Sequence, residues 1–143
     1  MRLQTSYFAM NNYVLWEGMI PVVISTSVPF WNDAFILYDK LYPPNDILWD
    51  YKNGKISEQE YVKRYTERIL SKLDPHEIYK ELMGLSEGKP VCLMCWEKSG
   101  KFCHRHIVAE WFREAGYLIY EYTTINIGDT NDERDFIQRK KRR

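Results

Sequence analysis

Two short runs of apolar residues predict buried strands. Residues 19–25 read MIPVVIS and are rich in β-branched side chains, and residues 91–96 read VCLMCW without a polar interruption. Continuous apolar runs of this length are typical of central strands that are covered on both faces. A further strand is expected at residues 117–125, after the glycine at position 116. The chain therefore supplies strands for a buried sheet.

Helices are predicted between these strands. The first spans residues 57–73, starts with a capping box of Ser57 and Glu60, and carries apolar side chains every fourth position that can lie on a sheet. A second helix is predicted over residues 74–84, with a capping aspartate at its start and a glycine at its end. A third is predicted over residues 104–116. These helices can cover the faces of the sheet.

The order of elements predicts an α/β fold. The apolar strand at 91–96, the helix after it and the strand at 117–125 form a βαβ unit, which requires parallel strands. A chain of 143 residues with 45% hydrophobic residues buries one core but hardly two. We therefore expect a single compact domain over residues 1–138, with a mostly parallel central sheet flanked by helices, and a basic tail at residues 139–143.

Charge gives the chain no general attraction to nucleic acid or to acidic membranes. Lysine and arginine together number 20, and aspartate and glutamate also number 20, so any such attraction must be local. The one candidate is the unbroken cationic run at residues 139–143. We interpret it as a solvated tail, with a phosphate-binding arm as the alternative.

The sequence also predicts a location for the protein. No stretch reaches the roughly 18 apolar residues of a membrane span, and the N-terminus lacks a signal pattern. Three clustered cysteines, Cys92, Cys95 and Cys103, cannot all pair with one another, so we expect free thiols in a reducing compartment. We therefore predict a cytoplasmic protein with no membrane partner, and the sequence sets no oligomeric state.

Reactive side chains gather between Cys95 and Arg105. The segment and its neighbour at 106 hold two thiols, one carboxylate, two imidazoles, an arginine and two lysines around a glycine turn. In open α/β sheets ligands bind beyond the carboxyl ends of the strands, where loops converge and helix N-termini point their free amides outward. The segment occupies that place, so we predict that it forms the functional site.

The candidate catalytic groups are Cys103, Glu97 and Cys95. Cys103 is expected at the start of a helix, where the helix dipole and the neighbouring Arg105 favour the thiolate that acts as a nucleophile. Glu97 is a candidate general acid or base if burial raises its pKa. The planar fork of Arg105 suits recognition of a phosphate or carboxylate.

Plain structural interpretations stand beside these. Cys92 is expected to pack in the core. Cys103 and the two residues after it are alternatively a helix cap with a surface arginine, and Glu97 is alternatively a solvent-facing turn residue. We expect no metal ion and no cofactor, because Cys92 and Cys95 lie on a strand whose alternating side chains point to opposite faces, whereas zinc knuckles place two such cysteines in a tight turn.

The segment at residues 91–106, continuing to 109–111, resembles the signature of the family called domain of unknown function 488. Members of that family show an apolar strand ending in Cys-x-Glu-Lys, a short turn, then Cys-His-Arg and a helix with Ala-Glu. The matching positions here are Cys95, Glu97, Lys98, Cys103, His104, Arg105 and Glu110. The resemblance extends to residues 6–9 and 20–31. It implies a compact α/β fold and supplies no settled reaction.

One departure from that family concerns the loop after the strand at 19–25. The resemblance implies an arginine there, whereas residues 26–28 read TSV. We therefore expect an anionic ligand to be held less tightly at this loop, or held differently.

Together these observations predict a pocket that binds or processes a small anionic metabolite, such as a nucleotide or a nucleotide-derived signal. As an enzyme it would be a hydrolase or group transferase that uses Cys103 or Glu97. The alternatives are a nucleic-acid-interacting protein that uses the basic tail and a thiol redox sensor that uses Cys95 and Cys103. The predicted ligand-binding residues are Arg105, His104, Lys98, Trp96, Ser25, Trp31, Tyr7 and Asn12.

Overall fold

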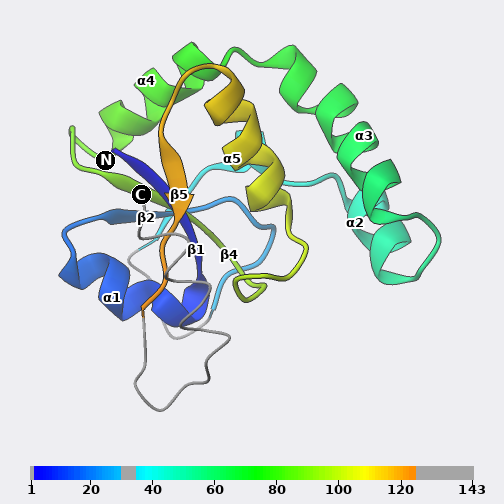
Figure 1. The fold of residues 1–143 in the computed structure, drawn as a ribbon, viewed down its shortest axis with the longest axis horizontal. Helices are drawn as coiled ribbons and strands as arrows, with labels where there is room; N and C mark the ends of the chain where they lie inside the picture. The colour runs from blue at the N-terminus through cyan, green and yellow to red at the C-terminus, as the bar shows by residue number, and fades with distance from the viewer. Residues whose placement is uncertain (1, 30–34, 125–143) are drawn as a thin grey trace.

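The structure, a computed structural model, describes residues 2–29 and 35–124 (Figure 1). Its centre is a five-stranded sheet in which every pair of neighbouring strands is parallel, in the order β3-β2-β4-β1-β5. The strands are β1 (Leu3–Tyr7), β2 (Ile20–Val23), β3 (Ile36–Leu37), β4 (Val91–Cys95) and β5 (Ile119–Glu121). The structure therefore confirms the predicted α/β fold, a single compact domain with a parallel central sheet.

Helices cover both faces of the sheet, as Figure 1 shows. The α-helices are α1 (Asn11–Trp16), α2 (Asn45–Lys52), α3 (Glu58–Arg68), α4 (Pro75–Leu85) and α5 (His104–Glu114). Short 3-10 helices lie at Phe8–Met10, Asp39–Leu41 and Leu70–Lys72. Among the described residues no helix is long and apolar enough to span a membrane.

The caps predicted for α3 and α4 are present. The Ser57 side chain accepts a hydrogen bond from the Glu60 amide at 3.0 Å, and Asp74 accepts one from the His76 amide at 3.1 Å. The predicted end of α4 at Gly84 is wrong, because the helix runs through that glycine to Leu85. The glycine that terminates this segment is Gly88, whose φ of 84° lies in the left-handed region that favours glycine.

The alternation of β4 divides the core into two layers. Val91 and Leu93 face the layer built with α2 to α5, whereas Cys92 and Met94 face a smaller cluster with α1. The prediction that Cys92 packs in the core agrees with its position, and burial raises the pKa of its thiol well above the ordinary value. Cys95, three residues further along, points to the α5 side.

The strand β1, like β3 and α1, is an element that the hydrophobic pattern missed. Its sequence, LQTSY, contains one aliphatic residue, yet Thr5 and Ser6 are both buried. Their hydroxyls donate to Glu121 at 2.5 Å and to the Tyr122 carbonyl at 2.7 Å. Because these partners lie 116 positions away, no local pattern marks β1 as a central strand.

Candidate functional site

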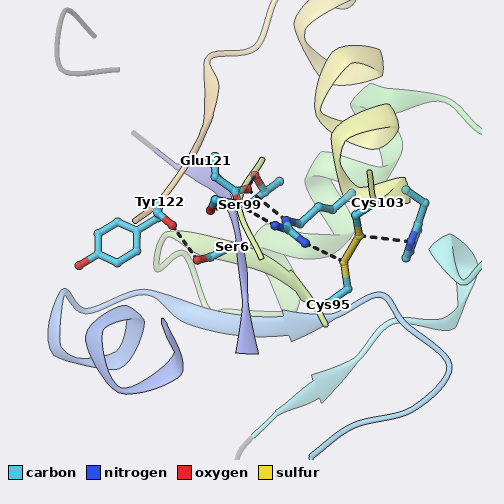
Figure 2. A network of polar contacts seen from close by, with 9 residues as sticks. Ser6, Cys95, Ser99, Cys103, Glu121 and Tyr122 are labelled. Atoms are coloured by element: carbon cyan, nitrogen blue, oxygen red, sulfur yellow. Dashed lines mark hydrogen bonds and ion pairs between the residues drawn. A yellow bond between two sulfur atoms is a disulfide. The ribbon is translucent and has the colours of Figure 1, made fainter. Parts of the chain in front are cut away.

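The predicted segment lies at the carboxyl edge of the sheet. Cys95 ends β4, and Tyr7, the last residue of β1, is its direct neighbour in the parallel register. Cys103 is the residue immediately before α5 and has extended backbone angles. The loop between β4 and α5 therefore brings the two cysteines back to one place (Figure 2).

A disulfide joins Cys95 and Cys103. This differs from the free thiols expected from the sequence, because eight positions of spacing do not reveal that the end of a strand and the start of a helix converge. Only Cys92 is free among the three cysteines, and it lies on the opposite face of β4. The Cα atoms of the pair are 7.8 Å apart, wider than the roughly 4.4–6.8 Å that disulfides usually span.

A buried arginine lies beside this sulfur pair. The Arg105 Nη1 donates to the Cys95 Sγ at 3.2 Å, and its Nε and Nη2 donate to the two carboxylate oxygens of Glu121 at 3.1 and 2.7 Å. Arg105 is 0% exposed. The alternative of a surface arginine is therefore wrong, and the guanidinium lies against the Cys95 sulfur.

Glu121 anchors that arginine from β5. Its carboxylate also accepts hydrogen bonds from Thr5 at 2.5 Å and from Ser99 at 2.6 Å; Figure 2 shows Ser99 beside Glu121. Burial alone would raise the pKa of Glu121, but the bonds and charge of Arg105, with the two hydroxyls, hold the pKa of this carboxyl below its ordinary value. The acid is therefore an anion at neutral pH, and it fixes the orientation of the guanidinium.

The imidazole of His104 has one defined tautomer. Its Nε2 lies 2.6 Å from the Ile24 carbonyl oxygen, which only accepts, so Nε2 carries the proton. Its Nδ1 is therefore unprotonated and lies 3.9 Å from the Cys103 Sγ. Burial lowers the pKa of His104 to about 4, so the ring is neutral at physiological pH. One ligand atom each from Cys95, Cys103 and His104 lie within 4.8 Å of one another.

A cavity of about 320 Å³ opens beside Cys103 and His104. Its aromatic wall consists of Tyr51, Tyr61 and Phe102, whose ring centroids are 4.9 to 5.6 Å apart. Its remaining lining residues are Leu48, Lys52, Glu58, Glu97 and Lys101. Helix α2, helix α3 and the loop before α5 thus meet around one hollow, which has both apolar surface and charged groups of each sign.

The other predicted site residues are spread more widely. The exposed Trp96 donates from its indole nitrogen to the Ser27 hydroxyl at 2.8 Å, and Ser25 donates to the Ser27 carbonyl at 2.7 Å. Tyr7 has its ring centroid 6.0 Å from the Arg105 Cζ. None of these side chains is among those that line the cavity described above.

Two further predicted residues are also placed apart from that cavity. Lys98 is exposed in the loop after β4. Asn12 is exposed on α1, the helix that packs on the opposite face of the sheet. Trp31 and the basic tail at residues 139–143 lie outside the described residues. The structure therefore gathers Glu97, Cys95, Cys103, His104 and Arg105 and does not bring Asn12 to them.

Several site residues were not predicted. Tyr51 and Lys52 come from α2 and Tyr61 comes from α3, where Tyr61 was predicted to be a sheet-facing position of an amphipathic helix. Glu121 did carry a signal, because an isolated carboxylate in an apolar strand requires a buried partner. Lys101 and Phe102 lie inside the predicted segment.

Comparison with known proteins matches the chain to a family. Residues 29–116 match the family model DUF488-N3a, described as the active DUF488-N3 subclade. No curated protein matches the chain, and no solved structure matches it. The matched range contains the thiol pair, His104, Arg105 and all the residues that line the cavity.

Proposed function

The chain belongs to the domain of unknown function 488 family, and from that premise we propose that its cavity binds and processes a small anionic metabolite, with a nucleotide or a nucleotide-derived signal as the ligand class. The observation that carries the proposal is the cavity of about 320 Å³ between α2, α3 and the loop before α5. Pockets for small molecules begin at about this volume and are largely apolar, with a few placed polar groups.

The chemistry of the wall favours a nucleotide over a simple inorganic anion. Lys52 and Lys101 supply cationic donors for phosphate oxygens, and the two partly exposed rings of the aromatic wall, Tyr51 and Phe102, supply faces on which a base stacks. Glu58 and Glu97 would repel a bare anion, but they accept hydrogen bonds from ribose hydroxyls or from exocyclic amines. A ligand that combines phosphate with such donors satisfies both kinds of side chain.

Two side chains of the cavity are suited to chemistry on the ligand. Cys103 borders the cavity at the N-terminus of α5, where backbone amides stabilise a thiolate. Glu97 lies in the same wall as a candidate general acid or base. These residues fit a hydrolase or a group transferase, and they act only in the dithiol form, in which Cys103 is available. A reducing cytoplasm, the location we propose, maintains that form.

Native mass spectrometry of the reduced full chain tests this function. We expect nucleotides to remain bound and inorganic phosphate alone to bind far more weakly. Absence of every nucleotide complex, or equal binding of phosphate, contradicts the proposal. A Cys103→Ser variant then separates the two roles of the cavity. Turnover lost with ligand affinity retained supports a reacting thiol, and unchanged turnover removes that thiol from the mechanism.

One observation favours a second function, thiol redox sensing. The sulfur atoms of Cys95 and Cys103 are bonded, and a disulfide is the product that oxidation of a two-thiol sensor gives. In the oxidation a peroxide accepts two electrons and two protons from the two thiols, which leaves one disulfide and, for hydrogen peroxide, two molecules of water. The nucleic-acid alternative rests on the tail, which lies outside the described residues.

A further inference from the structure

Three potential metal ligands converge where β4 ends and α5 begins. The sulfurs of Cys95 and Cys103 and a ring nitrogen of His104 lie within 4.8 Å of one another, and all three side chains are buried. Figure 2 shows the two cysteines approaching one another from these two elements. Two thiolates and one imidazole form a donor set that is typical of zinc.

We propose that the dithiol form of the protein binds one zinc ion through Cys95, Cys103 and His104, with one coordination position open to the cavity. Zinc sites are almost always four-coordinate, and three protein ligands with one open position are the pattern of sites that bind water or substrate. Cys103 and His104 both line the cavity, whereas Cys95 does not. The open position therefore faces the space in which a metabolite fits.

The imidazole is already arranged as a ligand. The Ile24 carbonyl accepts from the His104 Nε2, which leaves the lone pair of Nδ1 directed to the side of the Cys103 sulfur, 3.9 Å away. A histidine that binds a metal through one ring nitrogen usually donates a hydrogen bond from the N–H of the other nitrogen to a carbonyl or carboxylate. This hydrogen bond fixes both the tautomer and the ring orientation. The bond to Ile24 is an outer-shell contact of this kind.

The second outer-shell contact comes from Arg105. Its Nη1 donates to the Cys95 sulfur at 3.2 Å, while Glu121 holds the rest of the guanidinium. A cationic donor stabilises a thiolate, which is the protonation state that binds metal. Because Arg105 and Glu121 neutralise one another, two thiolates and one divalent cation leave the buried cluster without net charge.

The zinc form and the disulfide form exclude one another, since both use the same two sulfurs. A dithiol reductant first gives two electrons and two protons to the disulfide and becomes oxidised itself, and zinc then displaces the two thiol protons. The Cα separation of 7.8 Å exceeds the range that disulfides usually span. An ion between the two sulfurs would bridge such a separation without requiring their direct bond.

The proposal of a metal site is independent of the proposed metabolite binding. It does change the role of Cys103 in the proposed catalysis. With zinc bound, Cys103 is a ligand instead of a nucleophile. The donor set also differs from the one rejected on the sequence, because Cys92 lies on the other face of β4 and takes no part.

Cobalt(II) titration of the reduced, metal-free full chain tests the site without any nucleotide. We expect one cobalt per chain, with sulfur-to-cobalt charge-transfer absorption and the intense visible bands of a tetrahedral ion, and displacement by zinc. Cys103→Ser removes a ligand and should weaken binding by more than the roughly 10–100-fold that is usual for outer-shell changes. Cys92→Ala is the matched cysteine control and should bind cobalt like the wild type.

A second comparison needs no variant, which guards against a substitution that fails to fold. Wild-type protein oxidised at Cys95 and Cys103 should give no cobalt bands, and reduction should restore them. The proposal is overturned if the reduced chain gives no such bands, if the oxidised chain gives them equally, or if a folded Cys103→Ser variant binds cobalt unchanged. Failure of nucleotide binding, by contrast, leaves the cobalt result intact and refutes only the proposed function.

Discussion

The Nη1 atom of Arg105 lies 3.2 Å from the Sγ atom of Cys95. The same guanidinium makes a two-bond pair with Glu121, and both side chains are almost completely buried. The arginine therefore serves two purposes, since it holds a positive charge against a sulfur and it compensates a carboxylate that could not otherwise be buried. A thiol site and a structural ion pair thus share one residue.

Removal of this arginine should destabilise the fold strongly. In Arg105→Met the buried Glu121 carboxylate loses its partner, and we expect the free energy of unfolding to fall by about 3–5 kcal/mol, as for other broken buried pairs. Urea denaturation measures the change. The double variant Arg105→Met with Glu121→Leu should recover much of it. Arg68→Met, in the exposed pair with Asp46, is the control and should have little effect.

The Glu121 carboxyl predicts a specific pH dependence of stability. Its pKa in the folded protein lies below the ordinary value of 4.5, so its contribution is fully present above about that pH and is lost as the pH falls through the folded-state pKa. The stability difference between wild type and Glu121→Gln should therefore shrink below pH 4.5. Thermal unfolding across this range measures it.

Oxidation should link one pair of cysteines only. Mild peroxide treatment of the reduced protein is expected to join Cys95 to Cys103, because their side chains meet, and to leave Cys92 as a thiol, because it is buried on the other face of β4. Peptide mapping by mass spectrometry identifies the link through the loss of two hydrogen atoms. Cys92→Ala should oxidise in the same way. A Cys92–Cys95 link as the main product would contradict the observed faces.

Two lysines should contribute to affinity for a nucleotide. Hydrogen bonds to charged groups contribute roughly 1.5–3 kcal/mol, so Lys52→Ala or Lys101→Ala is expected to weaken binding by about tenfold or more. Isothermal titration calorimetry at constant salt measures this change. Lys80→Ala, an exposed lysine of α4, is the matched control. Equal affinities for the wild type and all three variants would show that the ligand does not bind in the cavity between α2, α3 and the loop before α5.

The elements that the sequence predicts correctly have local causes. The β4 run is apolar at every position because both faces of the strand are covered, and the caps of α3 and α4 lie within three residues of the amides that they bind. β1 was missed because the burial of Thr5 and Ser6 depends on residues at the other end of the described chain. A hydrophobic pattern does not record such distant bonds.

The candidate site likewise has a part that local sequence predicts and a part that depends on how the elements pack. The position of Cys95 at the carboxyl edge of the sheet and of Cys103 before α5 follow from strand and helix boundaries, which local sequence marks. The cavity wall from α2 and α3 depends on how these helices pack, which spacing along the chain does not reveal. The orientation of Arg105 depends on Glu121, and the sequence does not reveal that the guanidinium contacts the Cys95 sulfur.

The position of β5 beside β1 also sets the order in which the site becomes complete during synthesis. Thr5 leaves the ribosome 116 positions before the Glu121 that it contacts. Until β5 docks, the Arg105 guanidinium of α5 lacks its carboxylate partner, and the arginine beside the Cys95 sulfur is not held in place. A nascent or truncated chain that ends before Ile119 should therefore contain every cysteine of the site and still lack the site itself.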